Sequence, residues 1–227
     1  MDAVSIHEFD PSQHFTAAFW DERYGTGDRV WSGNPNRRVV EVVEAMTTAR
    51  EDAGTPPGRA LDVGCGEGAD AIWLAERGWE TTGADVSQRG LDKARVHALE
   101  RGVDDRTTWA RVDLVAGDPL PGGQDLVTCA FLHLPSPHLE HAYAAVAAAT
   151  VTGGTFVVVA HHPHDARTGL RNPGLAALLL SPERVVEALE EVGGWEVRQA
   201  DAPTREQNDA DGRAVTVTDT VVVAVRR

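Results

Sequence analysis

The strongest constraint on the fold is an alternation of strand and helix patterns through the middle of the chain. Helical patterns separate most of a series of short apolar segments that are typical of buried strands. These segments lie at 59–64, 79–86, 107–114, 124–132 and 153–160. Such alternation predicts a mostly parallel sheet with helices on both faces. Right-handed crossovers bring the carboxyl ends of the strands to one edge, where sheets of this class bind ligands.

The segments on either side complete the expected architecture. Helical spacing at 13–24 and 37–50 precedes the first strand, and Ser181 is placed to cap a helix after the fifth. Two further strand patterns follow at 195–200 and 214–225, joined by a polar loop. A loop of this kind between consecutive strands predicts an antiparallel pair.

The segment LDVGCGEG at 61–68 brings three glycines to the end of the first strand. A backbone with so few side chains is typical of a loop that approaches a cofactor closely. Gly64, Gly66 and Ala69 fit a loose dinucleotide-binding pattern. That pattern is weak by itself, because several cofactors bind at such loops. The residues after the second and third strands distinguish among them.

Two acidic strand ends favour an adenosine group held across three neighbouring strands. Asp85 ends the second strand, where its carboxylate is placed to accept both ribose hydroxyls, and Val86 is placed to pack on an adenine face. Asp113 ends the third strand, where it is placed to accept from an adenine amino group while the Leu114 N–H donates to a ring nitrogen. Asp85 suits NAD as well as S-adenosylmethionine. The segment after the fifth strand has no room for a dehydrogenase's second catalytic domain, which favours S-adenosylmethionine.

The motifs LDVGCGEG, GADVS, ARVDL and DLVTCAFLHLP, in this order, resemble those of S-adenosylmethionine-dependent methyltransferases of the Rossmann-like type. The resemblance covers about residues 59–160. It implies an α/β three-layer sandwich around a mostly parallel seven-stranded sheet with an antiparallel C-terminal strand. The segment FWDERYGTGDRVWSGNPN resembles the cofactor cap of the thiopurine, halide and tellurite methyltransferase group. It implies a helical cap and lid at 1–58, in one domain with the S-adenosylmethionine-binding part at 59–227.

The resemblance implies roles for the residues around the methionine part of the cofactor. Gly64 and Gly66 let the backbone approach this part, and Asp62 orients its amino group. Asp85 holds the ribose. The same resemblance assigns Asp113 with Leu114 to the adenine.

At the sulfonium end, the resemblance places Ala130 and Phe131 beside the transferable methyl group. Trp20 and Trp31 would cover it, because an aromatic face attracts a cation. Ordinary core packing of the two indoles is an equal alternative from the sequence alone.

Histidines follow the last two parallel strands at the ligand edge. His133 follows the fourth strand, and His161 and His162 follow the fifth. We expect these three to contact the methyl acceptor, where a histidine takes the proton of an oxygen or nitrogen acceptor. A thiolate or halide acceptor needs no base. We expect no metal, because neither a cysteine nor a spaced carboxylate set accompanies the histidines.

The net charge of −14 argues against a nucleic-acid or membrane partner, since phosphate groups repel an acidic chain. Lys93 is the only lysine. FLHLP follows the fourth strand in place of the Asp/Asn-Pro-Pro-Tyr motif of DNA and RNA amino-methyltransferases. We therefore expect a small-molecule acceptor. The sequence specifies no oligomeric state.

Two features indicate a cytoplasmic protein. Cys65 and Cys129 form no metal or redox motif and are expected to be buried free thiols, as in a reducing compartment. Residues 1–10 lack the apolar stretch of a signal peptide, and the Ala-rich run at 142–151 is too short to span a bilayer.

These observations favour a methyltransferase that moves a methyl group from S-adenosylmethionine to a small molecule by in-line displacement. Two alternatives stay open. One is a non-catalytic S-adenosylmethionine-binding sensor or partner subunit, and the other is an NAD-dependent oxidoreductase.

Overall fold

The computed structural model describes residues 15–27, 29–52, 54–168, 170, 173–209 and 211–227. Its α-helices are Ala17–Tyr24 (α1), Arg37–Asp52 (α2), Ala69–Glu76 (α3), Gln88–Glu100 (α4), His138–Ala149 (α5) and Pro182–Val192 (α6). Its strands are Arg59–Val63 (β1), Glu80–Asp85 (β2), Thr107–Arg111 (β3), Gln124–Ala130 (β4), Thr150–His161 (β5), Trp195–Asp201 (β6), Thr204–Asn208 (β7) and Ala214–Arg226 (β8). Short 3₁₀ helices lie at Asp104–Arg106, Pro163–Arg167 and Pro173–Leu178.

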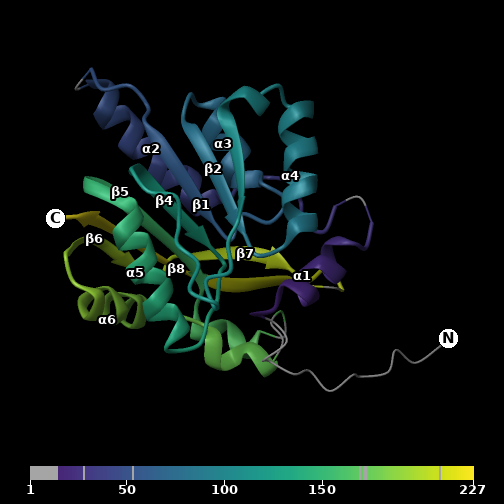
Figure 1. Cartoon of the computed structure of the whole chain (residues 1–227). Helices are drawn as coiled ribbons and strands as arrows, with labels where there is room; N and C mark the ends of the chain where they lie inside the picture. Colours follow the sequence, from purple (N-terminus) through teal and green to yellow (C-terminus); the bar gives the residue numbers. More distant parts are fainter. Residues whose placement is uncertain (1–14, 28, 53, 169, 171–172, 210) are drawn as a thin grey trace.

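The strands form one sheet in the order β3-β2-β1-β4-β5-β8-β6, with β7 paired to β8 beside it. Strands β1 to β5 pair in parallel, whereas β8 runs antiparallel to β5, β6 and β7. This arrangement confirms the predicted Rossmann-like α/β sheet and its antiparallel C-terminal pair. The carboxyl ends of the parallel strands meet at one edge of the sheet (Figure 1).

Two details of the sheet differ from the prediction. The sequence predicts seven strands with a polar loop before the last, but eight strands occur within the described residues because part of that loop forms β7. Strand β7 is polar throughout, so it lacks the apolar face that marks a strand in a sequence. Strand β3 ends at Arg111, so Asp113 and Leu114 lie beyond it in a connection without a helix.

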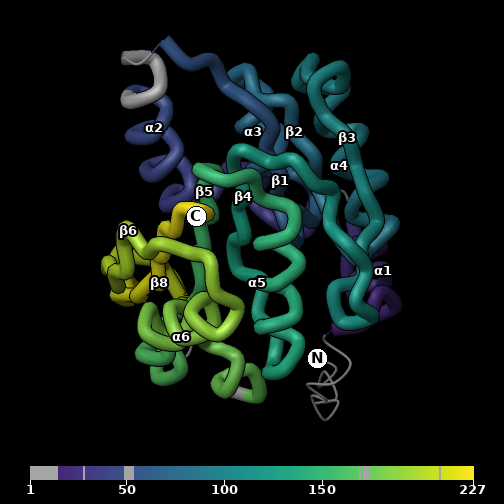
Figure 2. The backbone as a smooth tube through the Cα atoms, turned by 60° about the vertical axis from the view of Figure 1, so that its left-hand side comes forward, coloured from purple at the N-terminus to yellow at the C-terminus, as the bar shows by residue number. Residues whose placement is uncertain are grey.

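Two apolar cores lie on opposite faces of the sheet, because side chains alternate between faces along each strand. In β5, Val157 and Val159 pack toward helices α2 and α3, whereas Phe156 and Val158 pack toward α5 and α6. Helices α2, α3 and α4 therefore form one outer layer, and α5 and α6 form the other (Figures 1 and 2).

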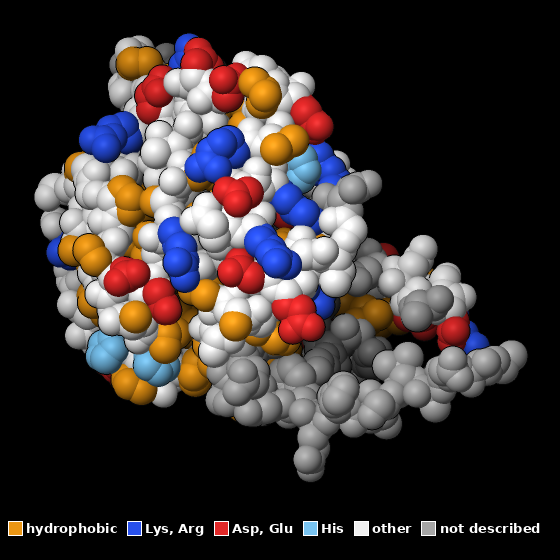
Figure 3. All heavy atoms as spheres, turned by 45° about the vertical axis from the view of Figure 1, so that its right-hand side comes forward, with side chains coloured by type: hydrophobic (Ala, Val, Ile, Leu, Met, Phe, Trp, Pro, Cys, Tyr) orange, Lys and Arg blue, Asp and Glu red, His pale blue; other side chains and the backbone are white. Residues whose placement is uncertain are grey.

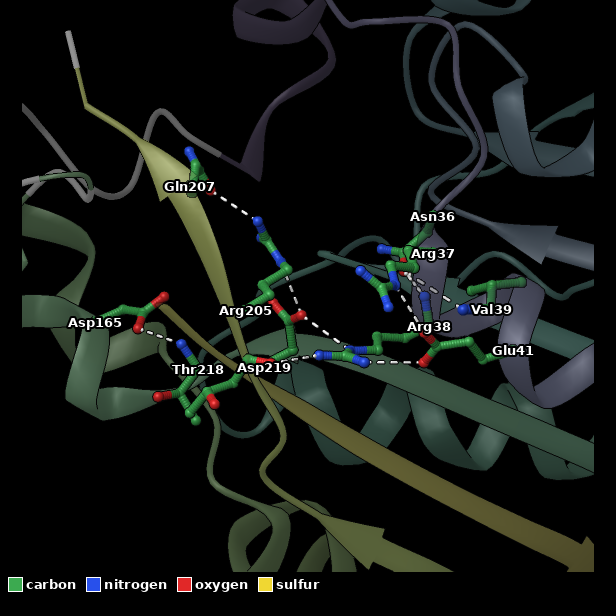
Figure 4. Close-up of polar contacts among 11 residues, drawn as sticks. Asn36, Arg37, Arg38, Val39, Glu41, Asp165, Arg205, Gln207, Thr218 and Asp219 are labelled. Atoms are coloured by element: carbon green, nitrogen blue, oxygen red, sulfur yellow. Dashed lines mark hydrogen bonds and ion pairs between the residues drawn. The ribbon is translucent and has the colours of Figure 1, made fainter. Parts of the chain in front are cut away.

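A buried carboxylate ties the start of α2 to the C-terminal strands. The side chain of Asp219 is 2% exposed, and its Oδ2 accepts from Arg38 Nε at 3.2 Å and from Arg205 Nε at 2.9 Å. Figure 4 shows the two guanidinium groups converging on this carboxylate. Asp219 is paired in register with His161. The ion cluster thus fixes α2 and β7 beside the carboxyl end of β5.

Candidate cofactor and acceptor site

The glycine loop between β1 and α3 is tied by its backbone to the end of β2. The Gly64 N–H donates to the Ala84 carbonyl oxygen at 2.8 Å, and the Gly66 N–H donates to Asp85 Oδ2 at 2.8 Å. Gly66 has a φ of 53°, and a Cβ there would lie 2.4 Å from Tyr24 Oη. A side chain at this position is therefore excluded twice, by the left-handed backbone and by the tyrosine.

Asp85 is held in a fixed orientation at the end of β2. Besides the Gly66 bond, its Oδ1 accepts from the Ser87 N–H at 2.8 Å. Burial raises the pKa of Asp85, although the hydrogen bonds from backbone N–H groups oppose this shift. Each carboxylate oxygen keeps a further lone pair. The arrangement therefore suits a diol that donates two hydroxyls, and Val86 follows as a half-buried apolar neighbour.

Two further carboxylates lie buried near the loop. Asp62 Oδ1 accepts from Thr128 Oγ1 at 2.9 Å, and Asp70 Oδ1 accepts from the Asn36 N–H at 2.5 Å. Burial raises the pKa of Asp62 well above its usual value and that of Asp70 to about 6, and the Asp70 charge adds to the shift at Asp62. A nearby ammonium group would favour their charged forms. This environment fits the predicted contact of Asp62 with an amino group.

Asp113 organises the turn after β3. Its Oδ1 accepts from the N–H groups of Val115 and Ala116, each at 3.0 Å, and its own N–H donates to Asp118 Oδ2 at 3.0 Å. Leu114 is half-buried and packs against the core on the α5 and α6 side. The turn that carries Asp113 and Leu114 is therefore already held in place. Contact of these two residues with an adenine stays a prediction.

The two predicted tryptophans meet at Tyr24. Trp20 stacks on the Tyr24 ring with centroids 5.8 Å apart, and Trp31 Nε1 donates to Tyr24 Oη at 3.2 Å. Tyr24 is 4% exposed, and burial followed by the Asp85 charge raises its pKa, so its hydroxyl stays neutral. Trp31 is 48% exposed, which is not the burial of a core residue. The pair of indoles thus lies around a tyrosine that touches Gly66.

Helix α1 is fixed against the start of α4. Asp21 Oδ1 accepts from Ser87 Oγ at 2.6 Å and from the Arg89 N–H at 3.1 Å. The Tyr24 ring packs against Gly90, where a Cβ would lie 3.1 Å from two ring carbons. These contacts place the N-terminal helix over the same sheet edge as the glycine loop.

An aromatic stack marks the ends of β4 and β5. The rings of Phe131 and His161 stack at 4.1 Å with an interplanar angle of 22°, and His133 stacks on His161 at 5.2 Å. Phe131 has a φ of 59°, which an L-residue adopts at a cost of about 1–2 kcal/mol. The Phe131 N–H donates to the Val159 carbonyl oxygen at 2.7 Å and helps to hold this conformation. Strained residues of this kind concentrate at functional sites.

The structure separates His162 from this stack. His162 is buried, its Nδ1 accepts from the His164 N–H at 3.1 Å, and its ring lies 4.3 Å from the His164 ring. Burial lowers the pKa of His162. Because successive residues of an extended chain face opposite sides, His161 and His162 do not point into one site. His133 and His161 are the two predicted histidines that the structure brings together.

Ala130 and Leu132 lie at and just beyond the end of β4. Ala130 is the half-buried last residue of β4 and packs against the core under α2 and α3. Leu132 lies over the glycine loop, with side-chain carbons 3.5 Å from where a Cβ of Gly64 would stand. Among the residues that the structure describes, no group of three or more His, Cys, Asp or Glu side chains is arranged to hold a metal ion.

Three residues near this site were not predicted from the sequence: Tyr24, Glu67 and Asp70. Glu67 accepts hydrogen bonds from residues 30 and 31, and Asp70 from Asn36. Their partners lie more than 30 residues away in the chain, so no local spacing reveals them. For Tyr24, the signal was its place four residues after Trp20, on the same face of one helix.

Residues 60–154 match the family model of the methyltransferase domain. The glycine N-methyltransferase of Oryctolagus cuniculus is 35% identical over 175 residues, which cover 67% of this chain and 59% of that protein. The chain thus spans about three fifths of this curated relative's length. The chain therefore carries a methyltransferase domain, as the sequence motifs predicted.

Solved structures share the fold at low identity. TehB from Haemophilus influenzae matches with a TM-score of 0.65 and 16% identity, over 93% of this chain and 67% of that one. The magnesium protoporphyrin IX methyltransferase ChlM from Synechocystis, solved with bound SAH, matches with a TM-score of 0.63 and 20% identity over 95% of this chain and 97% of that one. These likenesses confirm the predicted fold. No helix in the described part of the chain is long and apolar enough to cross a membrane.

Proposed function

We propose that this protein binds S-adenosylmethionine at the glycine loop and transfers its methyl group to a small-molecule acceptor by in-line displacement. The methyltransferase domain at 60–154 and the similarity to a glycine N-methyltransferase support the reaction class. The glycine N-methyltransferase acts on a small molecule. We propose a small-molecule acceptor for this chain as well, without proposing that it is glycine.

The observation that carries the proposal is the Asp85 carboxylate, fixed by the N–H groups of Gly66 and Ser87 beside a loop with glycines at alternate positions. The residues present fit the cofactor: Asp85 would hold the ribose, the loop would receive the methionine part, and Asp62 and Asp70 would face its amino group. Asp113 with Leu114 would hold the adenine. When bound, the cofactor supplies a methyl group activated by a sulfonium.

The chain's own residues would then position the acceptor and exclude water. The indoles of Trp20 and Trp31 provide apolar surface beside the loop, and Phe131 provides an aromatic face that is 38% exposed. Orientation of two reactants in a site closed to water can contribute about 7–11 kcal/mol to a displacement. His133 and His161 are the groups on this edge that can take a proton from an oxygen or nitrogen acceptor.

We also propose that residues 1–58 act as a cap and lid within one domain, although residues 1–14 of this segment lie outside the part of the chain that the structure describes. We further propose that the protein works in the cytoplasm. Both cysteines are free and buried, which suits a reducing compartment. A nucleic-acid acceptor is disfavoured by the net charge of −14. On the face in Figure 3, basic and acidic side chains are interspersed and form no continuous basic field.

Two other functions make different predictions. A sensor or partner subunit would bind S-adenosylmethionine and S-adenosylhomocysteine without turnover. An NAD-dependent oxidoreductase would bind a nicotinamide cofactor in their place.

A screen of thiols, halides, amines and phenols for release of S-adenosylhomocysteine tests the proposed reaction. We expect release above the protein-free rate with at least one class, and loss of that release in Asp85→Ala. Tight cofactor binding with no release from any class would favour the sensor. The class that reacts also decides whether a base is needed, since thiolates and halides react without one.

A further inference from the structure

We infer that Glu67 is a positioning residue that holds the lid segment on the glycine loop and thereby sets the affinity for the cofactor. The lid segment comprises the described residues between α1 and α2, 25–27 and 29–36. This inference rests on the proposed function, because it concerns the same cofactor.

The Glu67 carboxylate collects backbone N–H groups of the lid segment. Its Oε2 accepts from the N–H groups of Val30 at 3.0 Å and Trp31 at 3.1 Å, and its Oε1 lies 3.1 Å from the same Val30 nitrogen. The side chain is 5% exposed. Hydrogen bonds to a charged carboxylate are stronger than neutral ones, so these contacts hold the lid segment firmly to the loop.

Lys93 completes the contact from helix α4. Its Nζ lies 3.1 Å from Glu67 Oε1 and donates to the Gly27 carbonyl oxygen at 2.7 Å. The one lysine of the chain therefore compensates the buried charge of Glu67 and also binds the lid segment directly. Removing one partner of a buried ion pair is strongly destabilising, because it leaves the other charge uncompensated.

The lid segment depends on these side chains because it has no helix or strand of its own. Backbone N–H groups outside regular structure must find other acceptors. Glu67 serves Val30 and Trp31, and Asp70 serves Asn36 at the other end. With the Trp31 backbone held in this way, its indole reaches Tyr24 Oη and lies over Gly66.

Glu67 also lies in the part of the loop that would receive the cofactor. It follows Gly66, whose N–H orients Asp85, and its own carbonyl oxygen lies 3.1 Å from the His97 ring nitrogen of α4. The backbone at this position is thus fixed independently of the side chain. Loss of the carboxylate should release the lid segment and leave the loop itself in place.

The test compares Glu67→Gln with a matched control, Glu80→Gln. Both remove one negative charge, but Glu80 is an exposed residue of β2 that pairs with Arg106 far from the lid segment. We expect the dissociation constant for S-adenosylhomocysteine to rise at least about tenfold in Glu67→Gln, because one charge-assisted hydrogen bond is lost. In the control it should stay within about twofold of the wild-type value. Hydrogen exchange at the Val30 and Trp31 amides should accelerate in Glu67→Gln without ligand.

Two further variants separate positioning from a general loss of stability. Lys93→Met keeps the aliphatic stem and should weaken binding in the same direction, so the inference stays testable if Glu67→Gln fails to fold. In a Trp31→Ala background, Glu67→Gln should cost much less affinity than in the wild type, because Glu67 acts through the indole. The inference would be overturned if the affinity losses of Glu67→Gln and Trp31→Ala added in the double variant and matched the fall in melting temperature.

The outcomes also distinguish this inference from the proposed function. If the wild type binds S-adenosylhomocysteine and Glu67→Gln binds it equally well, only the role of Glu67 is wrong. If the wild type binds neither S-adenosylhomocysteine nor S-adenosylmethionine, both proposals are wrong.

Discussion

The two halves of the ligand edge are built differently. At the ends of β1 and β2, backbone N–H groups and carboxylates fix each other, as at Gly66 with Asp85 and at Ser87 with Asp85. At the ends of β4 and β5, the principal contacts are ring stacks among Phe131, His161 and His133. The first half is specified by backbone geometry, whereas the second is specified by side-chain packing.

This difference indicates which half can change between related proteins. A cofactor part held by backbone groups depends on a few glycines and acids, and any sequence that keeps them keeps the site. A ring stack can be rebuilt with other side chains on the same strands. We therefore expect the cofactor to be common to the methyltransferase domain and the acceptor to be particular to this chain.

The largest effect is expected at the acceptor half, on substitution of His161. His133 Nε2 already accepts a hydrogen bond from the backbone N–H of His161 at 3.2 Å. Of these two histidines, we therefore expect His161 to be the base for an oxygen or nitrogen acceptor. His161→Ala should lower kcat by about 10²–10⁴ and abolish the fall of kcat/KM at low pH. His141→Ala, an exposed position on α5, is the control. Unchanged pH profiles for His161→Ala with such an acceptor would exclude this role.

The next effect is at the cofactor half and concerns stability. The folded-state pKa of Asp70 is raised to about 6 by burial, so its stabilising contribution is complete below about pH 4 and is lost as pH rises through about 6. Asp70→Asn stays neutral and keeps an acceptor for the Asn36 N–H. The free energy of unfolding of Asp70→Asn relative to wild type should therefore grow by up to about 3 kcal/mol between pH 4 and pH 7.

Urea denaturation of both proteins without ligand, at a series of pH values, measures this difference. A difference that does not vary with pH would mean that Asp70 is not protonated preferentially in the folded state. A smaller pH effect with saturating S-adenosylhomocysteine would place the cofactor's amino group near this carboxylate.

A smaller effect comes from a side chain in the glycine loop. Gly66→Ala and Gly102→Ala both place an L-residue at positive φ, but a Cβ at Gly102 has no heavy atom within 4 Å and one at Gly66 meets Tyr24 Oη. Gly102→Ala should lose about 1–2 kcal/mol of stability, and Gly66→Ala should lose more because its Cβ also meets Tyr24. Only Gly66→Ala should also weaken S-adenosylhomocysteine binding, by about tenfold, as calorimetry would report. Equal affinity in the two variants would show that Tyr24 and Gly66 need not meet for binding.

Most of the fold could be predicted from the sequence because its elements carry apolar patterns. Strands β1, β2, β4 and β5 carry buried apolar residues, so their patterns have a local cause, whereas β3 has no fully buried residue. Strand β7 could not be predicted, because its residues are polar on both faces and its pairing with β8 is a property of the folded chain. The connection between β3 and β4 contains no helix, and the sequence patterns predicted none there.

The sequence predicted the candidate site best for residues whose place follows from the end of a strand. Asp85 and the glycine loop lie together as expected, and His133 and His161 meet because β4 and β5 are neighbours. Glu67 was missed because its partners are distant in the chain, whereas Tyr24 was missed although it lies four residues after Trp20 on the same helix. The expected grouping of His162 with His161 did not take account of the alternation of side chains at the strand end.

Calorimetric titration of the wild type and Asp85→Ala with S-adenosylhomocysteine and with NAD tests the central claim most directly. Asp105→Ala, an exposed acid after α4, is the charge-matched control. We predict that the wild type and the control bind S-adenosylhomocysteine, that Asp85→Ala binds it at least about tenfold more weakly through loss of charge-assisted hydrogen bonds, and that NAD gives no measurable heat. Preferential binding of NAD, or equal affinity for S-adenosylhomocysteine in Asp85→Ala and the control, would contradict the account.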